Sequence, residues 1–419
     1  MTMAKNKVIC ALDIGSSKVA TLVAQVREDD ESRLHIVGAA AATSRGIRKG
    51  QIVNIEEAVS SIEESVGAAE RMAGYNISKG WAAIGGAHIG SLNSQGVVAV
   101  AQPQGEVTPT DVGRVMEAAR AVTLPTSTEI IHVIPRSYTV DGQEGVKDPV
   151  GMTGVRLEVE TQIVTGSGTA IKNLAKCIAE VGCDLEGVVF SGLASAEAVL
   201  SDTEKELGVV VVDIGGGTTD IAIWVEGALA YCAVLPVGAK NVTNDLAIGL
   251  RVSLESAEKI KLALGEAKPK EDELDLSQIG LGEELKAVSY KTLVEGIIRP
   301  RLNELFTMVA GEVKKSSFAG LTPSGLVVCG GGAQTVGIVE SARRVLSAPV
   351  RIGIPTGITG LIDEIENPAF ATSVGLLKYA NAQDKEGGSW GKNWSNPLEK
   401  LSGSGAWGKI SDLFKSLLP

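Results

Sequence analysis

Residues 208–220 read GVVVVDIGGGTTD and set the architecture of the whole chain. The four valines are β-branched and apolar, which predicts a strand buried on both faces. The strand runs into Asp213 and the glycines Gly215–Gly217, whose backbone can turn sharply and present N–H groups to an anion. Hydroxyls and a second carboxylate follow in Thr218, Thr219 and Asp220. This order predicts a site for a phosphate chain carrying Mg2+; an ordinary glycine-rich β-turn is the alternative.

A second copy of this arrangement lies near the start of the chain. Residues 8–18 read VICALDIGSSK, an apolar strand followed by Asp13 and a turn of small residues. Asp13 and Asp213 are separated by an offset of 200 positions. Two copies half a chain apart predict duplicated α/β halves that face each other across a nucleotide. A chance pair of similar turns is the alternative.

Composition excludes several classes of function. The 419 residues are enough for two or more domains, and a net charge of −11 argues against a broad nucleic-acid role. The five cysteines form no CxxC pair, which is typical of a reduced, cytosolic protein. The three scattered histidines make a histidine-rich metal site or a histidine triad improbable. The first apolar run, 8–12, is too short for a signal peptide, and no stretch approaches the roughly 20 apolar residues of a spanning helix, so we expect a soluble chain.

The periodicity of the apolar residues and the positions of capping and turn residues predict the helices and strands of each half. In the first half we expect strands at 8–12, 19–26, 34–42 and 188–190, a turn at 46–50, and helices at 54–73, 170–181 and 194–200. Asn54 is the expected N-cap of the first helix, and Gly74 is expected to end it. In the second half we expect helices at 239–250, 254–264 and 290–315, a strand entering glycines at 325–333, and a solvated excursion at 265–281. A helix at 368–379 is expected to close the globular part.

Residues 85–165 differ in texture from both halves. Short strands are expected at 96–101, 130–138 and 155–164, with one helix whose start is marked by TPTD at 108–111. This pattern predicts a small inserted α+β module.

Three glycine motifs carry a resemblance to a known superfamily. DIGSSK at 13–18, DIGGGTTD at 213–220 and CGGGA at 329–333 resemble the phosphate-1, phosphate-2 and adenosine motifs of the actin, Hsp70 and sugar-kinase superfamily. Within it, the chain is similar to the FtsA family of bacterial actin-like cell-division proteins over about residues 7–380 and again at the C-terminus. The more specific matches are GIRKGQIVN at 46–54 and DPVGMTGVRLE at 148–158, with support from AERMAG at 69–74 and PVGAKNVTNDLA at 236–247.

The resemblance implies an α/β, duplicated actin-like (ribonuclease H-like) ATPase fold with an inserted small α+β subdomain. The first half would comprise 1–84, 166–200 and 362–380, with the insert at 85–165. The core of the second half would comprise 201–227 and 306–361, with an outer subdomain at 228–305. Residues 381–405 would be a flexible linker, and 406–419 an amphipathic membrane-targeting helix.

The resemblance also implies ATP and Mg2+ in the central cleft. Asp13 and Asp213 would organise the water shell of the metal. Phosphates would be held by Gly15, Ser16, Ser17 and Lys18 on one side and by Gly215, Gly216, Gly217, Thr218 and Thr219 on the other. The adenosine would contact Gly330, Gly331, Gly332 and Ala333. Glu258 and Lys261 match an E-x-x-K pattern that contacts base and ribose in relatives, although their spacing fits a surface ion pair equally well.

Two positions depart from the superfamily pattern. Hydrolysing members often place a Glu or Gln, which positions the attacking water, where this chain has Ser191. We therefore expect no confidently assignable catalytic residue and at most slow ATP hydrolysis. Ala239 stands where the family usually has a second glycine, which leaves the backbone approach to the nucleotide there in doubt.

The C-terminal residues 407–418 have helical periodicity. At about 100° per residue, one arc holds Trp407, Ile410, Leu413, Phe414, Leu417 and Leu418, and the other holds Lys409, Asp412, Lys415 and Ser416. Such a short helix needs a surface to fold against: the protein's own body, a partner groove or a membrane. The preceding linker and the interfacial character of Trp407 favour a membrane, and the resemblance implies the same.

The function implied is that of an ATP-binding filament protein at the cytoplasmic face of the cell membrane, at the division site. Its partners would be further copies of itself, membrane lipids, the tubulin-like division protein FtsZ and other division proteins, with no nucleic acid. The family places its FtsZ-binding surface at about 228–305, where Arg299 and Arg301 could meet an acidic tail. The alternatives are a sugar-kinase-like phosphotransferase and an actin-like scaffold of pilus assembly; the roughly 40 residues after Tyr379 are too few for the substrate domain of an Hsp70-like chaperone.

Overall fold

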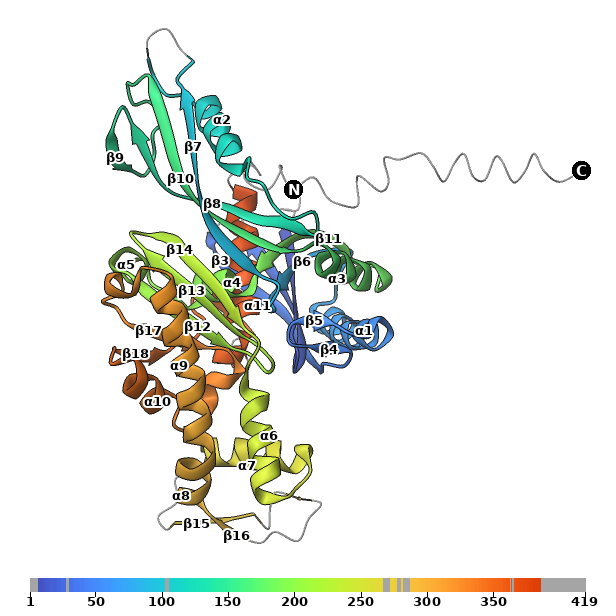
Figure 1. Cartoon of the computed structure of the whole chain (residues 1–419). Coiled ribbons are helices and arrows are strands. Elements are labelled where there is room, and N and C mark those ends of the chain that lie inside the picture. The colour runs from blue at the N-terminus through green and yellow to red at the C-terminus, as the bar shows by residue number, and fades with distance from the viewer. Residues whose placement is uncertain are drawn as a thin grey trace, which may run out of the picture. The chain divides into compact units, whose positions relative to one another are not determined.

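The structure is a computed structural model. It describes residues 7–27, 30–101, 105–266, 272–276, 280–281, 287–361, 363 and 365–385. Met1–Tyr379 forms one compact unit (Figure 1), which contains everything discussed below unless stated otherwise. Of the second unit, Ala380–Pro419, the structure describes the end of one helix. The predicted tail helix at 407–418 therefore lies outside the described residues.

The first half is built on one mixed sheet. Its strand order is β11-β6-β1-β2-β3-β19. The strands are β1 (Lys7–Ile14), β2 (Lys18–Arg27), β3 (Asp30–Thr43), β6 (Lys79–Ile84), β11 (Asp184–Phe190) and β19 (Ile358–Gly360). β1, β2 and β3 pair antiparallel, whereas β6 and β11 join in parallel. A short hairpin, β4 (Ile47–Arg48) and β5 (Gln51–Ile52), follows β3.

The second half repeats this sheet. Its order is β14-β13-β12-β17-β18, from β12 (Val209–Ile214), β13 (Thr219–Val225), β14 (Ala228–Leu235), β17 (Leu326–Cys329) and β18 (Val350–Ile352). In each half three antiparallel strands are extended on one side by two parallel ones, and the first half has β19 as a further parallel strand beside β3. The register is also the same, since Asp13 lies opposite Ala20 and Asp213 opposite Asp220. The predicted duplication and fold class are therefore confirmed, and all six residues of β12 are buried as their sequence predicts.

Helices cover these sheets where the sequence places their caps. α1 (Ile55–Ala73) begins after Asn54, whose side chain accepts a hydrogen bond from the amide of Glu57, and ends at Gly74 with φ 72°. α1 packs on β2 and β3, and α3 (Gly168–Glu180) packs on α1 and β11. α4 (Ser191–Val199) contacts strands of both halves, namely β6, β11, β12, β13 and β17. The short α5 (Asp202–Leu207) then leads into β12.

The module between β6 and α3 has its own sheet, of order β7-β10-β8-β9. Its strands are β7 (Gly90–Ala99), β8 (Thr128–Val140), β9 (Gln143–Val146) and β10 (Arg156–Ser167). α2 (Pro109–Arg120) lies along β7 and β10 in Figure 1, and Thr108 and Asp111 form the capping box that its sequence predicts. The predictions at 130–138 and 155–164 match β8 and β10, which are both longer at one or both ends. The prediction at 96–101 overlaps only the end of β7, which begins at Gly90, and β9 was not predicted.

The outer part of the second half is helical. α6 (Ala239–Leu250), α7 (Leu254–Glu266), α8 (Tyr290–Leu293) and α9 (Arg299–Lys315) surround the apolar core that they share with the sheet. The helix predicted across Pro300 is present, but Val294–Ile298 adopts a π-helical turn just before the proline. The wider turn accommodates the proline ring, which would clash with the carbonyl of an α-helical preceding turn. β15 (Glu273–Asp275) and β16 (Ala287–Ser289) pair as a two-stranded antiparallel ribbon. β15 lies within the excursion expected at 265–281, and β16 lies beyond it.

The chain closes with α10 (Ile338–Leu346) and α11 (Ala371–Lys385), the latter preceded by a 3-10 turn at Pro368–Phe370. α11 runs five residues into the range expected to be a linker. No helix in the described ranges is long and apolar enough to cross a membrane.

Candidate functional site

The two glycine turns close with the same hydrogen bond. The amide of Gly15 donates to the carbonyl of Lys18 at 3.0 Å, and the amide of Gly215 donates to the carbonyl of Thr218 at 2.9 Å. Each turn links the first two strands of its half, so the offset of 200 in sequence becomes a structural equivalence.

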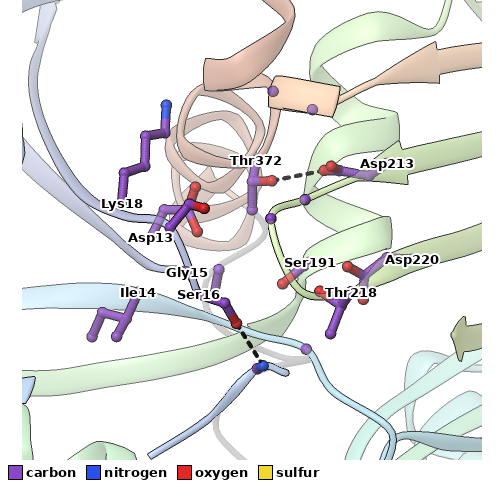
Figure 2. A pocket seen from close by; sticks show the side chains of 18 of the residues that line it. Asp13, Ile14, Gly15, Ser16, Lys18, Ser191, Asp213, Thr218, Asp220 and Thr372 are labelled. Carbon is purple, nitrogen blue, oxygen red and sulfur yellow. Dashed lines mark hydrogen bonds between the residues drawn. The ribbon is translucent and has the colours of Figure 1, made fainter. Parts of the chain in front are cut away.

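A cavity of about 180 Å3, open to solvent, lies where the turns meet. Figure 2 shows Asp13, Ser16 and Lys18 of the first turn on one side of it and Asp213, Thr218 and Asp220 on the other. Eleven of the predicted nucleotide-binding residues line it: Asp13, Gly15, Ser16, Ser17, Lys18, Asp213, Gly215, Gly216, Thr218, Gly330 and Gly331. The other lining residues are Ile14, Gly50, Ala83, Gly85, Ser191, Asp220, Ala369 and Thr372.

The two strand-terminal acids are held by adjacent residues of α11. The hydroxyl of Thr372 donates to Oδ2 of Asp213 at 2.9 Å, and that of Ser373 donates to Oδ2 of Asp13 at 3.3 Å. Ser195 of α4 also donates to Oδ2 of Asp213. Burial raises the pKa of Asp13 to about 6, and burial likewise raises the pKa of Asp213 against the lowering effect of its hydroxyl donors. A bound cation would offset this desolvation.

Asp220 is the third carboxylate of the cavity. It is only 4% exposed, and its Oδ1 has no hydrogen-bond partner among the described residues. Burial raises its pKa well above the usual range, with Asp213 and Asp13 adding to the effect. Carboxylate oxygens are the ligands that Mg2+ and its waters prefer, so an unsatisfied buried carboxylate beside two others fits a hydrated Mg2+ nucleotide.

Several glycines stand around the cavity at positions where a Cβ atom would collide with neighbouring residues. A Cβ on Gly216 would lie 2.1 Å from Oγ of Ser17, and one on Gly85 would lie 3.0 Å from Oδ1 of Asp220. Gly330 has φ 79°, and a Cβ there would meet Oδ1 of Asp213 at 2.2 Å. Space kept free in this way at the mouth of two turns suits close backbone approach to a polyphosphate.

The hydrogen-bonding groups of Ser16 and Lys18 are already engaged. The hydroxyl of Ser16 accepts from the amide of Gly50 at 2.9 Å, a contact drawn in Figure 2. Nζ of Lys18 donates to the carbonyl of Ala369 at 2.6 Å and lies 3.5 Å from the ring centroid of Phe370. Burial lowers the pKa of Lys18. The predicted direct phosphate contacts of these two side chains would therefore require them to exchange partners.

Six predicted residues do not line the cavity. Thr219 is buried in β13 and donates to the carbonyl of Val237 at 2.8 Å. Gly217 approaches Ser16, where its Cβ would lie 3.0 Å from the Ser16 hydroxyl, and Gly332 packs against Ile214. Ala333 is buried at 4% exposure. The last two, Glu258 and Lys261, lie on α7.

Glu258 and Lys261 form an ion pair with a third member. Nζ of Lys261 lies 2.7 Å from Oε2 of Glu258 and 3.0 Å from the hydroxyl of Thr243, which donates to Oε2 of Glu258 at 2.5 Å. The pair thus joins α7 to α6, which adds a structural role to the predicted one.

Ala239 is docked against the second glycine turn through its backbone, and its approach to a nucleotide stays a prediction. The amide of Ala239 donates to the carbonyl of Gly215, and that of Lys240 donates to the carbonyl of Gly216, each at 2.9 Å. The room for this docking is provided by the preceding residue, Gly238, because a Cβ there would lie 2.5 Å from the oxygen of Gly215.

Ser191 is the first residue of α4, so this helix begins three residues before the expected start.

Several residues that line the cavity were not predicted as site residues from the sequence. Asp220 could have been chosen, since it lies in the quoted motif and its alternation with Thr218 points both side chains to one face of a strand. Thr372, Ala369, Gly85 and Gly50 carry no local signal, because only the tertiary fold brings them to the turns.

The two arginines considered for an acidic partner are already paired. Arg301 holds Asp245 through Nε at 2.6 Å and Nη2 at 3.0 Å, and it also contacts Glu304. Arg299 pairs with Glu295 one turn earlier. Their structural role is to fasten α9 to α6 and to the π-helical turn.

Comparisons with known proteins agree with this geometry. The family model described as "Cell division protein FtsA" matches residues 210–375, and that described as "SHS2 domain inserted in FTSA" matches residues 86–165. A Pseudomonas aeruginosa protein named "Cell division protein FtsA" is 42% identical over 392 residues, covering 91% of each chain.

Solved structures share the fold at low sequence identity. A "PilM-PilN type IV pilus biogenesis complex" chain gives a TM-score of 0.61 at 15% identity, over 89% of this chain and 98% of that one. MreB5 of Spiroplasma citri bound to ADP gives 0.52 at 15% identity, over 91% and 98%. These likenesses support the actin-like fold.

Proposed function

The chain belongs to the FtsA family of cell division proteins, and from this membership we propose that it is an ATP-binding, actin-like filament protein of the division site. In this proposal it polymerises on the inner face of the cytoplasmic membrane, which it reaches through the amphipathic residues 406–419. There it anchors the tubulin-like ring protein FtsZ and recruits other division proteins.

One observation carries the nucleotide part of the proposal: two structurally equivalent acid-and-glycine turns, one from each half, line one cavity. A polyphosphate has negative charge on both sides of its chain, so donors from both turns can hold it at once. The MreB5 structure of the same fold was solved with ADP. Asp13 and Asp213 would hold Mg2+ through its water shell, and the metal would supply charge neutralisation of the phosphates.

We propose that ATP is mainly a structural and polymerisation ligand. Ser191 faces the cavity where hydrolysing relatives often have a Glu or Gln, and a hydroxyl is a poor general base. Asp220 lies nearby and its Oδ1 has no partner among the described residues, but burial and the neighbouring acids Asp213 and Asp13 raise its pKa well above the usual range, so it is a poor base at neutral pH. Turnover near the enzyme median of about 10 per second would contradict this part of the proposal.

The membrane and partner roles rest on the family and on the sequence of the tail. Six apolar side chains on one arc provide an upper bound of roughly 9–18 kcal/mol of burial, most of which is offset by helix ordering and association entropy. Attachment of one tail is therefore weak, and many tails along a filament would strengthen it through avidity. The surface that meets FtsZ would lie at about 228–305.

Calorimetric titration of the full chain with Mg2+-ATP tests the nucleotide proposal. We expect saturable binding to the wild type and at least tenfold weaker binding to Asp213→Asn, which removes the charge opposite the metal. Glu255→Asn is the matched control, because Glu255 is an exposed acid of α7 paired only with Lys259 among the described residues. Absence of ATP binding to the folded wild type, or equal affinity in Asp213→Asn, would overturn the assignment of this cavity.

A further inference from the structure

The side chain of Lys240 crosses from one half of the molecule to the other. Lys240 lies in the first turn of α6, in the second half, and its Nζ donates to the carbonyl oxygen of Ser16 at 2.7 Å. Ser16 belongs to the turn of the first half and lines the cavity. Lys240 lies within the 236–247 stretch that supports the family resemblance, but no site role is predicted for it from the sequence.

The backbone of Lys240 is fixed beside the second turn. Its amide donates to the carbonyl of Gly216, and the preceding amide donates to that of Gly215. Gly238 permits this docking because it has no Cβ. The lysine is therefore attached to one turn by its backbone and to the opposite turn by its ammonium group.

The carbonyl oxygen of Ser16 is a weak hydrogen-bond partner for the ammonium group of Lys240. A carbonyl oxygen satisfies one of three donors and carries no formal charge. Arg48 and Lys261 lie close enough to repel the ammonium group, and Glu258, the acid that attracts it, is already paired with Lys261. Burial and these neighbours lower the pKa of Lys240, with the attraction of Glu258 opposing them. Lys240 does not itself line the cavity, but it is bonded to Ser16, which does. The two cations near its ammonium group outnumber the one acid, Glu258, so an anion entering beside Ser16 would be attracted to it.

The location also matches the expected path of a nucleotide. Lys240 lies between Ser16 on the phosphate side and the Glu258–Lys261 pair on the side predicted for base and ribose. The residue remains exposed, so a ligand entering the cavity can reach its ammonium group. Independently, Oδ1 of the buried Asp220 has no hydrogen-bond partner among the described residues, so this cavity contains a polar atom that a bound ligand or its metal could satisfy.

We propose that Lys240 is a phosphate-binding residue of this cavity, whose ammonium group leaves the carbonyl of Ser16 for the phosphates of a bound nucleoside polyphosphate. The contact between the two halves would then depend on the nucleotide. The direct tie between Lys240 and Ser16 would be replaced by a tie through the phosphates. The inference rests on the proposed ATP binding and adds a residue and a cross-cleft contact to it.

Equilibrium binding of ATP and adenosine, both to the full chain, tests the proposal. Lys240→Gln should weaken ATP binding about tenfold or more, the effect of losing one charged hydrogen bond, and leave adenosine binding unchanged. Lys240→Arg should restore ATP affinity to within a few fold. The matched control is Lys259→Gln, a lysine of α7 paired with Glu255.

The outcomes separate this inference from the proposed function. Wild-type ATP affinity in a folded Lys240→Gln, checked by its thermal midpoint, would overturn the inference and leave the nucleotide cavity standing. Equal weakening of ATP and adenosine would also overturn it, since that result marks a purely structural tie. Failure of the wild type to bind ATP would overturn the proposed function and this inference together.

Discussion

The hydroxyl of Thr372 donates a 2.9 Å hydrogen bond to Oδ2 of Asp213, joining the start of α11 to the end of β12 across 159 positions of sequence. The next residue, Ser373, does the same for Asp13. One helix therefore orients the equivalent acids of both halves, which keeps the two turns in a fixed relation around the cavity.

Thr372→Val should destabilise the protein. The substitution keeps the shape of the side chain and removes a donor from a buried carboxylate, which costs about 1–3 kcal/mol in free energy of unfolding. Urea denaturation at pH 7 measures the change. Thr307→Val, which removes an exposed hydroxyl bonded to the carbonyl of Asn303, should cost less than about 0.5 kcal/mol. Equal effects of the two variants would show that Thr372 does not stabilise Asp213.

Gly238→Ala should impair both stability and nucleotide binding. The new methyl group would lie 2.5 Å from the oxygen of Gly215, so α6 must move away from the turn at a cost of about 1–3 kcal/mol. Gly311→Ala, in the interior of α9 with open space around it, should instead stabilise by about 0.5–1 kcal/mol. Thermal melts and ATP titrations measure both. A Gly238→Ala protein as stable as the wild type would contradict the tight docking of α6.

Glu204 should make stability fall in acid. Hydrogen bonds from Arg351 at 2.6 and 2.7 Å lower the pKa of Glu204 from 4.5 to about 2, against a raising effect of partial burial. A lowered folded-state pKa stabilises above the unfolded pKa, and this contribution is lost as pH falls from about 4.5 toward 2. After solvent screening we expect about 1–2 kcal/mol.

The test is the pH dependence of a variant. Glu204→Gln should be less stable than the wild type at pH 7, and the gap should narrow at pH 3.5, as measured by urea denaturation. Glu255→Gln, whose side chain is 80% exposed, should match the wild type at both pH values. A gap for Glu204→Gln that stays constant with pH would rule out ionic stabilisation by this residue.

The apolar arc at the C-terminus should be needed for lipid binding. Leu413→Glu places a charge in the middle of the arc, so the protein should leave anionic liposomes in co-sedimentation while ATP binding persists. Deletion of residues 406–419 should likewise release the protein from anionic liposomes and leave ATP binding intact. Ser416→Glu adds the same charge on the polar arc and should retain much more binding. Unchanged sedimentation of Leu413→Glu would refute a membrane role for this arc.

The sequence predicts this fold well where signals are local. Buried valines, terminal acids and glycine turns are short-range features, and the offset of 200 between their two copies predicts the duplication from the sequence alone. β6 (Lys79–Ile84) was missed, because it is a brief apolar run whose strand character comes from its position between β1 and β11.

The difference between local sequence signals and tertiary contacts also explains which residues of the cavity were predicted. Motif residues of the turns were found, whereas Thr372 and Gly85 reach the cavity only through tertiary structure. Lys240 was missed for a related reason, since its contact with Ser16 joins positions 224 apart. The pairing of Arg301 with Asp245 on α6 was equally invisible in sequence.

We propose that ATP, bound between the two equivalent turns, supports polymerisation on a membrane. Electron microscopy of the full chain on anionic lipid monolayers, with and without Mg2+-ATP, tests it most directly, with the chain lacking 406–419 as control. The account predicts filaments on the monolayer with ATP, few without it, and none on lipid for the truncated chain. Equal filaments with and without ATP, or none under either condition, would contradict it.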